Sequence, residues 1–131
     1  MTLDEIKNEC ATMQSELEQV LPTEINTAIG RMTIIAVYHA RAGQMLADAK
    51  LLLRKKKASE IADMVIKIAK EGYLSATAQK ALIESIAQDE AYFVDWLDRI
   101  NSMCVHQIDI LRSIVSKEKE EMKLSNYLPT N

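Results

Sequence analysis

Apolar residues recur every three or four positions along most of the chain, which is the spacing of one face of an α-helix. The first such run covers residues 3–20. Thr2 and Glu5 have the spacing of an N-terminal capping box. Pro22 disfavours helix at the preceding residue, and Thr23 can cap a new helix. The pattern therefore predicts a first amphipathic helix over about residues 3–20.

Two longer amphipathic runs follow. The 3/4 spacing continues over residues 24–71, although a break near residues 58–59 remains an open alternative. Gly72 is the next clear stop signal, and a further run covers residues 76–124 before the tail 125–131. The two runs are almost equal in length, and a short loop joins them. Helices joined in this way are expected to pack antiparallel.

The predicted fold is all-α: a long antiparallel helical hairpin with the N-terminal helix packed on it, in a single domain over residues 1–131. The rows of apolar residues along these helices, called seams below, are typical of a three- to four-helix bundle with coiled-coil-like packing. Folding about residues 72–75 places residue i opposite about residue 147 minus i. A compact four-helix bundle, broken near residue 59, is the structural alternative. Beyond the first helix the hairpin would be two helices thick, so we expect a homo-oligomer.

Composition agrees with this fold and narrows the setting. The chain is 48% hydrophobic and has only three glycines and two prolines, as expected for long helices. Cys10 and Cys104 lack metal-ligand spacing, so we expect them to be buried core residues. No leader or membrane-spanning run is recognisable, which predicts a cytoplasmic protein without membrane contact.

Charge is unevenly distributed along the chain. Residues 1–30 carry six acids and one lysine, whereas residues 31–57 carry seven bases and the single Asp48. The predicted register places Lys55 to Lys57 beside Glu90. Ion pairs within the chain would then neutralise much of this charge asymmetry. Glu16 and Glu18 are likewise expected near Arg31.

Nucleic-acid binding is an alternative reading of the same cations, because phosphates need a basic face and single strands add aromatic stacking. The basic candidates are Arg31, Lys50, Arg54, Lys55, Lys56 and Lys57. The possible stacking residues are Tyr38, Tyr73, Tyr92 and Trp96. Trp96 and its neighbour Phe93 are more typical of core anchors, with subunit interfaces as the competing role.

A layer of histidines and arginines is the candidate ligand site. His39 falls on the predicted apolar face, and the register brings His106 level with Arg41 and places Arg112 one turn further on. Arginine and histidine suit a nucleotide-like or other phosphate ligand. The chain has no Glu-x-x-His pair, and no third ligand is at hand, so a metal site is not expected. No catalytic motif is present, and we expect neither an enzyme nor a cofactor.

Two segments, "VYHARAGQMLADAKLLL" and "CVHQIDILRSIVSKEKEEMKL", resemble small helical accessory proteins encoded by bacteriophages and prophages. The resemblance covers about 40 of the 131 residues. It implies a bacterial cytoplasmic setting and a role as a helper in phage DNA metabolism or as an inhibitor of host defence. It assigns no functional residues.

Together these observations predict a non-enzymatic, oligomeric helical interaction protein with protein partners. A binding module for a phosphate compound and a nucleic-acid-binding protein are the two alternatives.

Overall fold

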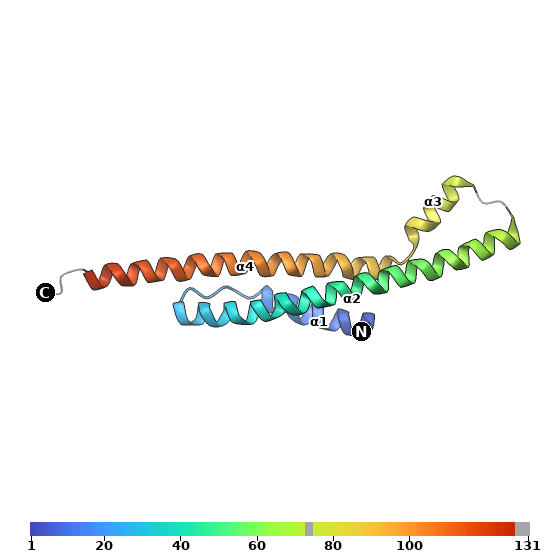
Figure 1. The fold of residues 1–131 in the computed structure, drawn as a ribbon. Helices are drawn as coiled ribbons and strands as arrows, with labels where there is room; N and C mark the ends of the chain where they lie inside the picture. Colours follow the sequence, from blue (N-terminus) through green and yellow to red (C-terminus); the bar gives the residue numbers. More distant parts are fainter. Residues whose placement is uncertain (73–74, 128–131) are drawn as a thin grey trace.

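A computed structural model describes residues 1–72 and 75–127, so Tyr73 and residues 128–131 of the expected tail lie outside the described residues. Within these ranges every regular element is a helix: α1 (Leu3–Leu17), α2 (Ile25–Glu71), α3 (Ala76–Ser85) and α4 (Gln88–Tyr127). The predicted all-α class is confirmed. Figure 1 shows α2 and α4 as two long rods that lie side by side and run in opposite directions, with α1 lying against their middle.

Helix α1 begins at the predicted capping box. Thr2 Oγ1 accepts a hydrogen bond from the Glu5 backbone N–H at 3.3 Å, and Glu5 Oε2 accepts one from the Thr2 N–H at 3.0 Å. The helix ends at Leu17, three residues earlier than expected. Side chains of the other long helices bind its last carbonyl groups: Arg31 donates to Glu16 O and Gln107 to Leu17 O. These bonds satisfy carbonyls that have no intrahelical partner.

Helix α2 runs without interruption through the "RKKK" sequence, so the continuous alternative for residues 24–71 is confirmed and no break occurs near 58–59. Its N-cap is Glu24 rather than the expected Thr23. The Glu24 carboxylate accepts the backbone N–H groups of Asn26 and Thr27 at 3.0 and 2.7 Å. Gly72 ends the helix with φ at +95°, a value that favours glycine.

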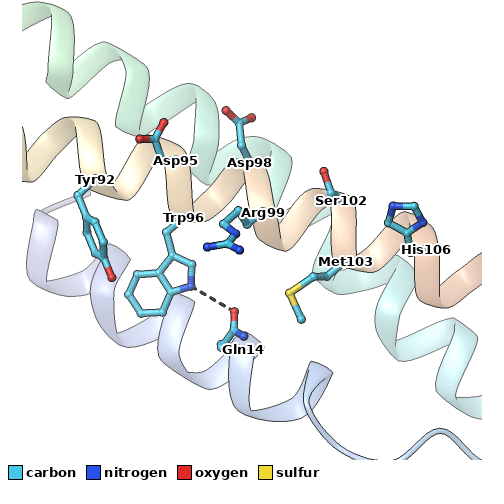
Figure 2. Close-up of a pocket in the computed structure, with 9 residues that line it drawn as sticks. All are labelled: Gln14, Tyr92, Asp95, Trp96, Asp98, Arg99, Ser102, Met103 and His106. Atoms are coloured by element: carbon cyan, nitrogen blue, oxygen red, sulfur yellow. Dashed lines mark hydrogen bonds between the residues drawn. The ribbon is translucent and has the colours of Figure 1, made fainter.

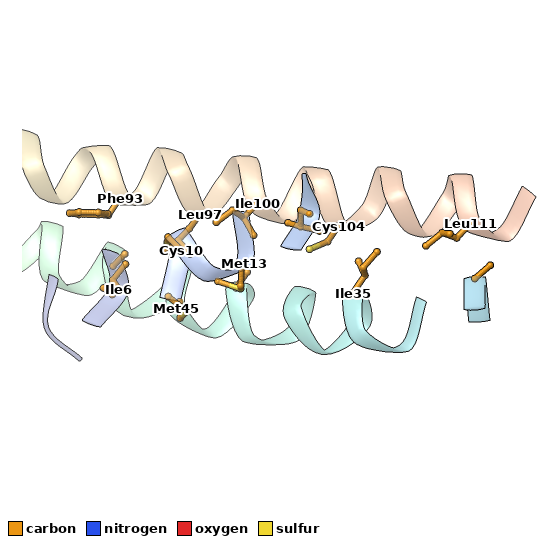
Figure 3. Packing of buried hydrophobic residues seen from close by; sticks show 14 of the residues in the cluster. Ile6, Cys10, Met13, Ile35, Met45, Phe93, Leu97, Ile100, Cys104 and Leu111 are labelled. Carbon is orange, nitrogen blue, oxygen red and sulfur yellow. The ribbon is translucent and has the colours of Figure 1, made fainter. Parts of the chain in front are cut away.

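The core lies where all three long elements meet. Figure 3 shows Leu97, Ile100 and Leu111 of α4 facing Ile35 and Met45 of α2. From α1, four fully or almost fully buried side chains complete this core: Ile6, Cys10, Met13 and Leu17. The apolar seam predicted for the first helix is therefore confirmed, and α1 fills the gap along one side of the hairpin.

The long helix expected over residues 76–124 is in fact two helices. Helix α3 ends at Ser85, and Ala87 takes a left-handed conformation with φ of 56° before α4 begins. Asp89 and Glu90 occupy the first turn of α4, where negative charge is favourable. In Figure 1, α3 leaves the line of α4 at an angle, and the distal part of α2 continues past the start of α4. Leu82, expected on the seam, is consequently 41% exposed.

His39 was predicted to lie on the buried face of α2. This prediction is wrong, because His39 is exposed. The neighbouring Tyr38 is half-buried and packs against the core instead. The reason is the position of α1, which covers the side of α2 that carries Tyr38; Met13 of α1 lines the same hollow as this tyrosine. Packing of a third helix thus rotates the buried face away from His39.

Candidate interaction surfaces

A broad groove of about 840 Å³ runs between α1 and α4 (Figure 2). The Trp96 indole Nε1–H donates a hydrogen bond to Gln14 Oε1 across the groove at 3.3 Å. Met103 and His106 lie further along α4 on the same wall, as Figure 2 shows. The groove is therefore open to solvent, and α4 provides all of its lining side chains except Gln14.

Five side chains of that wall form a row at spacings of four, three, four and three residues: Tyr92, Trp96, Arg99, Met103 and His106. The same wall also carries Asp95, Asp98 and Ser102. The Tyr92 ring packs on the rings of Phe93 and Trp96, with centroids 5.5 and 5.9 Å away. Tyr92 is nevertheless 61% exposed. Arg99 is exposed and binds no described residue. Tyrosine, tryptophan, methionine and arginine are the residues enriched at protein interfaces.

Sequence reasoning treated Trp96 and Phe93 mainly as core anchors and overlooked Arg99 and Met103. Phe93 is indeed buried at 9% exposure, whereas Trp96 is half-buried at the groove. The signal was available, because the row repeats the 3/4 spacing on a second face of the same helix.

The four residues predicted to bind a phosphate ligand do not meet in one cavity. His39 and Arg41 are two positions apart on α2 and so point about 200° away from each other. Arg41 lines a small groove of about 290 Å³ between α1 and α2, whereas His106 lines the groove between α1 and α4. Arg112 is exposed and lies 3.8 Å from Asp109 on its own helix.

Arg41 has a specific partner in Glu9 of α1. Its Nε and Nη2 donate to the two carboxylate oxygens at 2.9 and 2.8 Å. These hydrogen bonds, with the positive charge, hold the pKa of Glu9 below its usual value and raise the pKa of Arg41. The pair fixes α1 to α2, and it leaves Arg41 little capacity for a phosphate group.

Only some of the cations in the basic segment, residues 31–57, have partners within the chain. Arg31 donates to Glu16 O and to Gln19 Oε1, each at 3.1 Å, which places it near the expected segment of α1. Lys56 pairs with Glu60 one turn away at 3.4 Å. Lys55 and Lys56 share a hollow with Glu90, close to the predicted register, but no ion pair joins them to α4.

Four cations of the segment remain without a hydrogen bond or ion pair to any described residue: Lys50, Arg54, Lys55 and Lys57. Lys50, Arg54 and Lys57 are spaced by four and three residues, so they share one exposed face of α2. These four cations are therefore free to bind an external partner.

An uncharged stripe follows the solvent side of α2, opposite its core face. We call it the outer stripe; it consists of eight exposed residues spaced by four and three: Asn26, Gly30, Thr33, Val37, Ala40, Gln44, Ala47 and Leu51. Val37 is 63% exposed, and the flanking Ile29 and Ile34 are 43% and 49% exposed. The solvent face of a surface helix normally carries charged residues. The outer stripe is therefore an uncharged face that no described part of the chain covers.

Reactive thiols and metal clusters are not features of the described structure. Cys10 and Cys104 are fully buried, as predicted. Burial, with the nearby Glu9 charge, raises the pKa of Cys10 to about 11, and burial raises the pKa of Cys104. The described residues contain no group of three or more histidine, cysteine, aspartate or glutamate side chains placed to hold a metal ion. None of the described helices combines the length and apolarity needed to span a membrane.

Comparison of the chain with protein-family models, with curated proteins and with solved structures found no match.

Proposed function

We propose that this chain is a non-enzymatic helical interaction protein that works as an oligomer. The observation that carries the proposal is the size of its exposed surface. The chain has an accessible area of 9103 Å². A compact monomer of 14.8 kDa exposes only about 7,000 Å². The excess is about 2,000 Å², which is more than the roughly 800 Å² that one partner contributes to a standard interface.

The nature of the exposed residues supports the same proposal. Large apolar side chains lie open to solvent on the outer stripe, where Val37 is 63% exposed, and on the groove wall, where Tyr92 is 61% exposed. Extended uncovered apolar surface of this kind marks sites of protein association.

Native mass spectrometry of the purified protein, with sedimentation at several concentrations, tests this proposal. Association into a dimer or a larger closed assembly is the expected result. A chain that stays monomeric at about 100 µM, where even interfaces of micromolar affinity form, would contradict it.

The groove between α1 and α4 is the proposed docking site for a partner protein. Its row offers aromatic and thioether groups for burial and Arg99 as an unpaired donor, which suits an amphipathic helix with an acidic residue beside its apolar stripe. The resemblance to phage accessory proteins suggests a partner from DNA metabolism or host defence in a bacterial cytoplasm.

Trp96 is the only tryptophan of the chain, so its fluorescence reports on this groove. Partner binding should change that emission, and Arg99→Glu should weaken binding while leaving the oligomer intact. Lys67→Glu, on the distal part of α2, is the matched charge reversal. Equal loss of binding by both variants would remove the groove from the proposal.

Nucleic-acid binding is the second candidate, and the observation that favours it is the unpaired face of Lys50, Arg54 and Lys57. Three phosphate contacts to a single strand give a slope of log K against log salt of about −2. Fluorescence anisotropy with a labelled oligonucleotide would measure it. Absence of binding at about 50 mM salt would dispose of this candidate.

A further inference from the structure

We infer that a second copy of this chain covers the outer stripe of α2, packed antiparallel through its own outer stripe. This inference rests on the proposed function and specifies its interface. The spacing of four and three residues is maintained over residues 26–51, a length of about 38 Å. Such a repeat keeps one narrow face of a helix turned toward a neighbouring helix over its whole length.

A glycine of the outer stripe indicates that the neighbour comes close. Gly30 lies inside an unbroken helix, where glycine is unfavourable relative to alanine. A Cβ added at Gly30 would meet no atom of the chain within 4 Å. Nothing in the described part of the chain therefore requires this glycine, and close approach of another helix backbone would account for it. Thr33 and Ala40, also on the outer stripe, are small enough to permit the same approach.

The absence of charge points to a copy of the same chain. In a two-fold symmetric interface each patch meets itself, so a charged side chain near the axis would face its own equivalent. The outer stripe carries no charge between Asn26 and Leu51. The nearby Arg41 is held by Glu9 and turned toward α1. A self-complementary face is therefore available without any like-charge contact.

The charges beyond the outer stripe select the antiparallel orientation. A parallel pair would set the unpaired Lys50, Arg54, Lys55 and Lys57 of both copies side by side. An antiparallel pair with residue 26 opposite residue 51 places residue i opposite residue 77 minus i. Arg54 then lies level with Thr23 of the second copy, next to its exposed Glu24 carboxylate. An unpaired cation of each copy is thus placed near a carboxylate of the other.

The same register matches side-chain sizes across the interface. Val37 lies opposite Ala40, and Leu51 lies opposite Asn26. In these two pairs the larger side chain faces the smaller one, which is how layers of side chains interdigitate.

Disulfide trapping tests the orientation and register directly, because Cys10 and Cys104 are buried and do not compete. Thr33→Cys and Gln44→Cys are opposite each other in the inferred pair, since 33 and 44 sum to 77. The two single variants of the full chain are oxidised separately and as a mixture. Ser102→Cys, exposed on α4, is mixed with Thr33→Cys as the control.

The mixture of Thr33→Cys and Gln44→Cys should form a mixed disulfide dimer about tenfold faster than the control mixture, because association holds the two thiols together. Each variant alone should cross-link no faster than the control. Cross-linking of each variant with itself would show a parallel pair and overturn the inference. Association of the wild-type chain without the mixed disulfide would also overturn it and leave the proposed function standing. A monomeric wild-type chain would refute both.

Discussion

Arg41 of α2 and Glu9 of α1 form a two-pronged ion pair, with N–O distances of 2.9 and 2.8 Å, and it is the only ion pair between different helices in the described part of the chain. Both side chains are about half exposed. The pair therefore holds α1 in register with the hairpin, while the buried core supplies most of the stability.

Glu9→Gln should destabilise the protein by about 0.5–1 kcal/mol at pH 7, as expected for an exposed but well-aligned pair. The pKa of Glu9 is lowered in the folded state by the hydrogen bonds from Arg41. Its contribution is thus fully present above the ordinary value of 4.5 and is lost as pH falls through the lower folded pKa. Thermal unfolding as a function of pH measures this, with Glu84→Gln on α3 as the control. A difference from wild type that persists at about pH 2 would contradict the assignment.

The hydrogen bond from Trp96 to Gln14 should contribute about 0.5–1 kcal/mol to the docking of α1 on α4. Trp96→Phe and Gln14→Ala each remove it, and the double variant shows whether the two losses are coupled. Denaturant unfolding followed by circular dichroism gives the three free energies. Strictly additive losses would mean that the bond contributes nothing.

Gly72→Ala should destabilise the end of α2, because φ of 95° with ψ of −151° is a conformation available almost only to glycine. The expected cost is about 1–3 kcal/mol. Amide hydrogen exchange of the last turns of α2 detects it even if the rest of the protein stays folded. Gly43→Ala, measured where the chain is monomeric, should have the opposite sign, since this glycine is helical and has open space around it. Unchanged exchange in Gly72→Ala would show that this end is not held in the observed conformation.

Gly30→Ala should have opposite effects on the single chain and on its association. In the monomer it should stabilise α2 by up to about 1 kcal/mol, because alanine is the better helix former and nothing obstructs its methyl group. In the oligomer the methyl group should hinder close approach of the second copy and weaken association about tenfold, or about 1.4 kcal/mol. Melting curves at low and high protein concentration separate the two effects. A variant that is more stable at both concentrations would place Gly30 outside the interface.

Much of the fold was predictable because it depends on local pattern. The capping box at Thr2, the apolar seam of α1 and the continuity of α2 all follow from residue spacing. The break at Ala87 could not be predicted, since neither glycine nor proline marks it and alanine rarely adopts a positive φ. Side-chain packing at this junction, rather than local propensity, therefore decides where α4 begins.

The candidate sites were less predictable, because they depend on how each helix is rotated. The register correctly placed Lys55 near Glu90, yet it could not show that Arg41 faces Glu9 across a different groove from His106. A one-residue difference in the buried face, Tyr38 in place of His39, was enough to disperse the predicted histidine layer. Such rotations are set by the docking of α1, which the spacing within α2 does not encode.

Self-association through the outer stripe can be tested by sedimentation of three proteins side by side: wild type, Val37→Glu and Val65→Glu. Val37 and Val65 are similarly exposed, at 63% and 57%, so neither change should unfold α2. Wild type and Val65→Glu should associate, whereas Val37→Glu should sediment as a monomer, because its charge would be buried against Ala40 of the second copy and close to its own equivalent beside the two-fold axis. A Val37→Glu chain that associates as strongly as wild type would show that the outer stripe is not the interface.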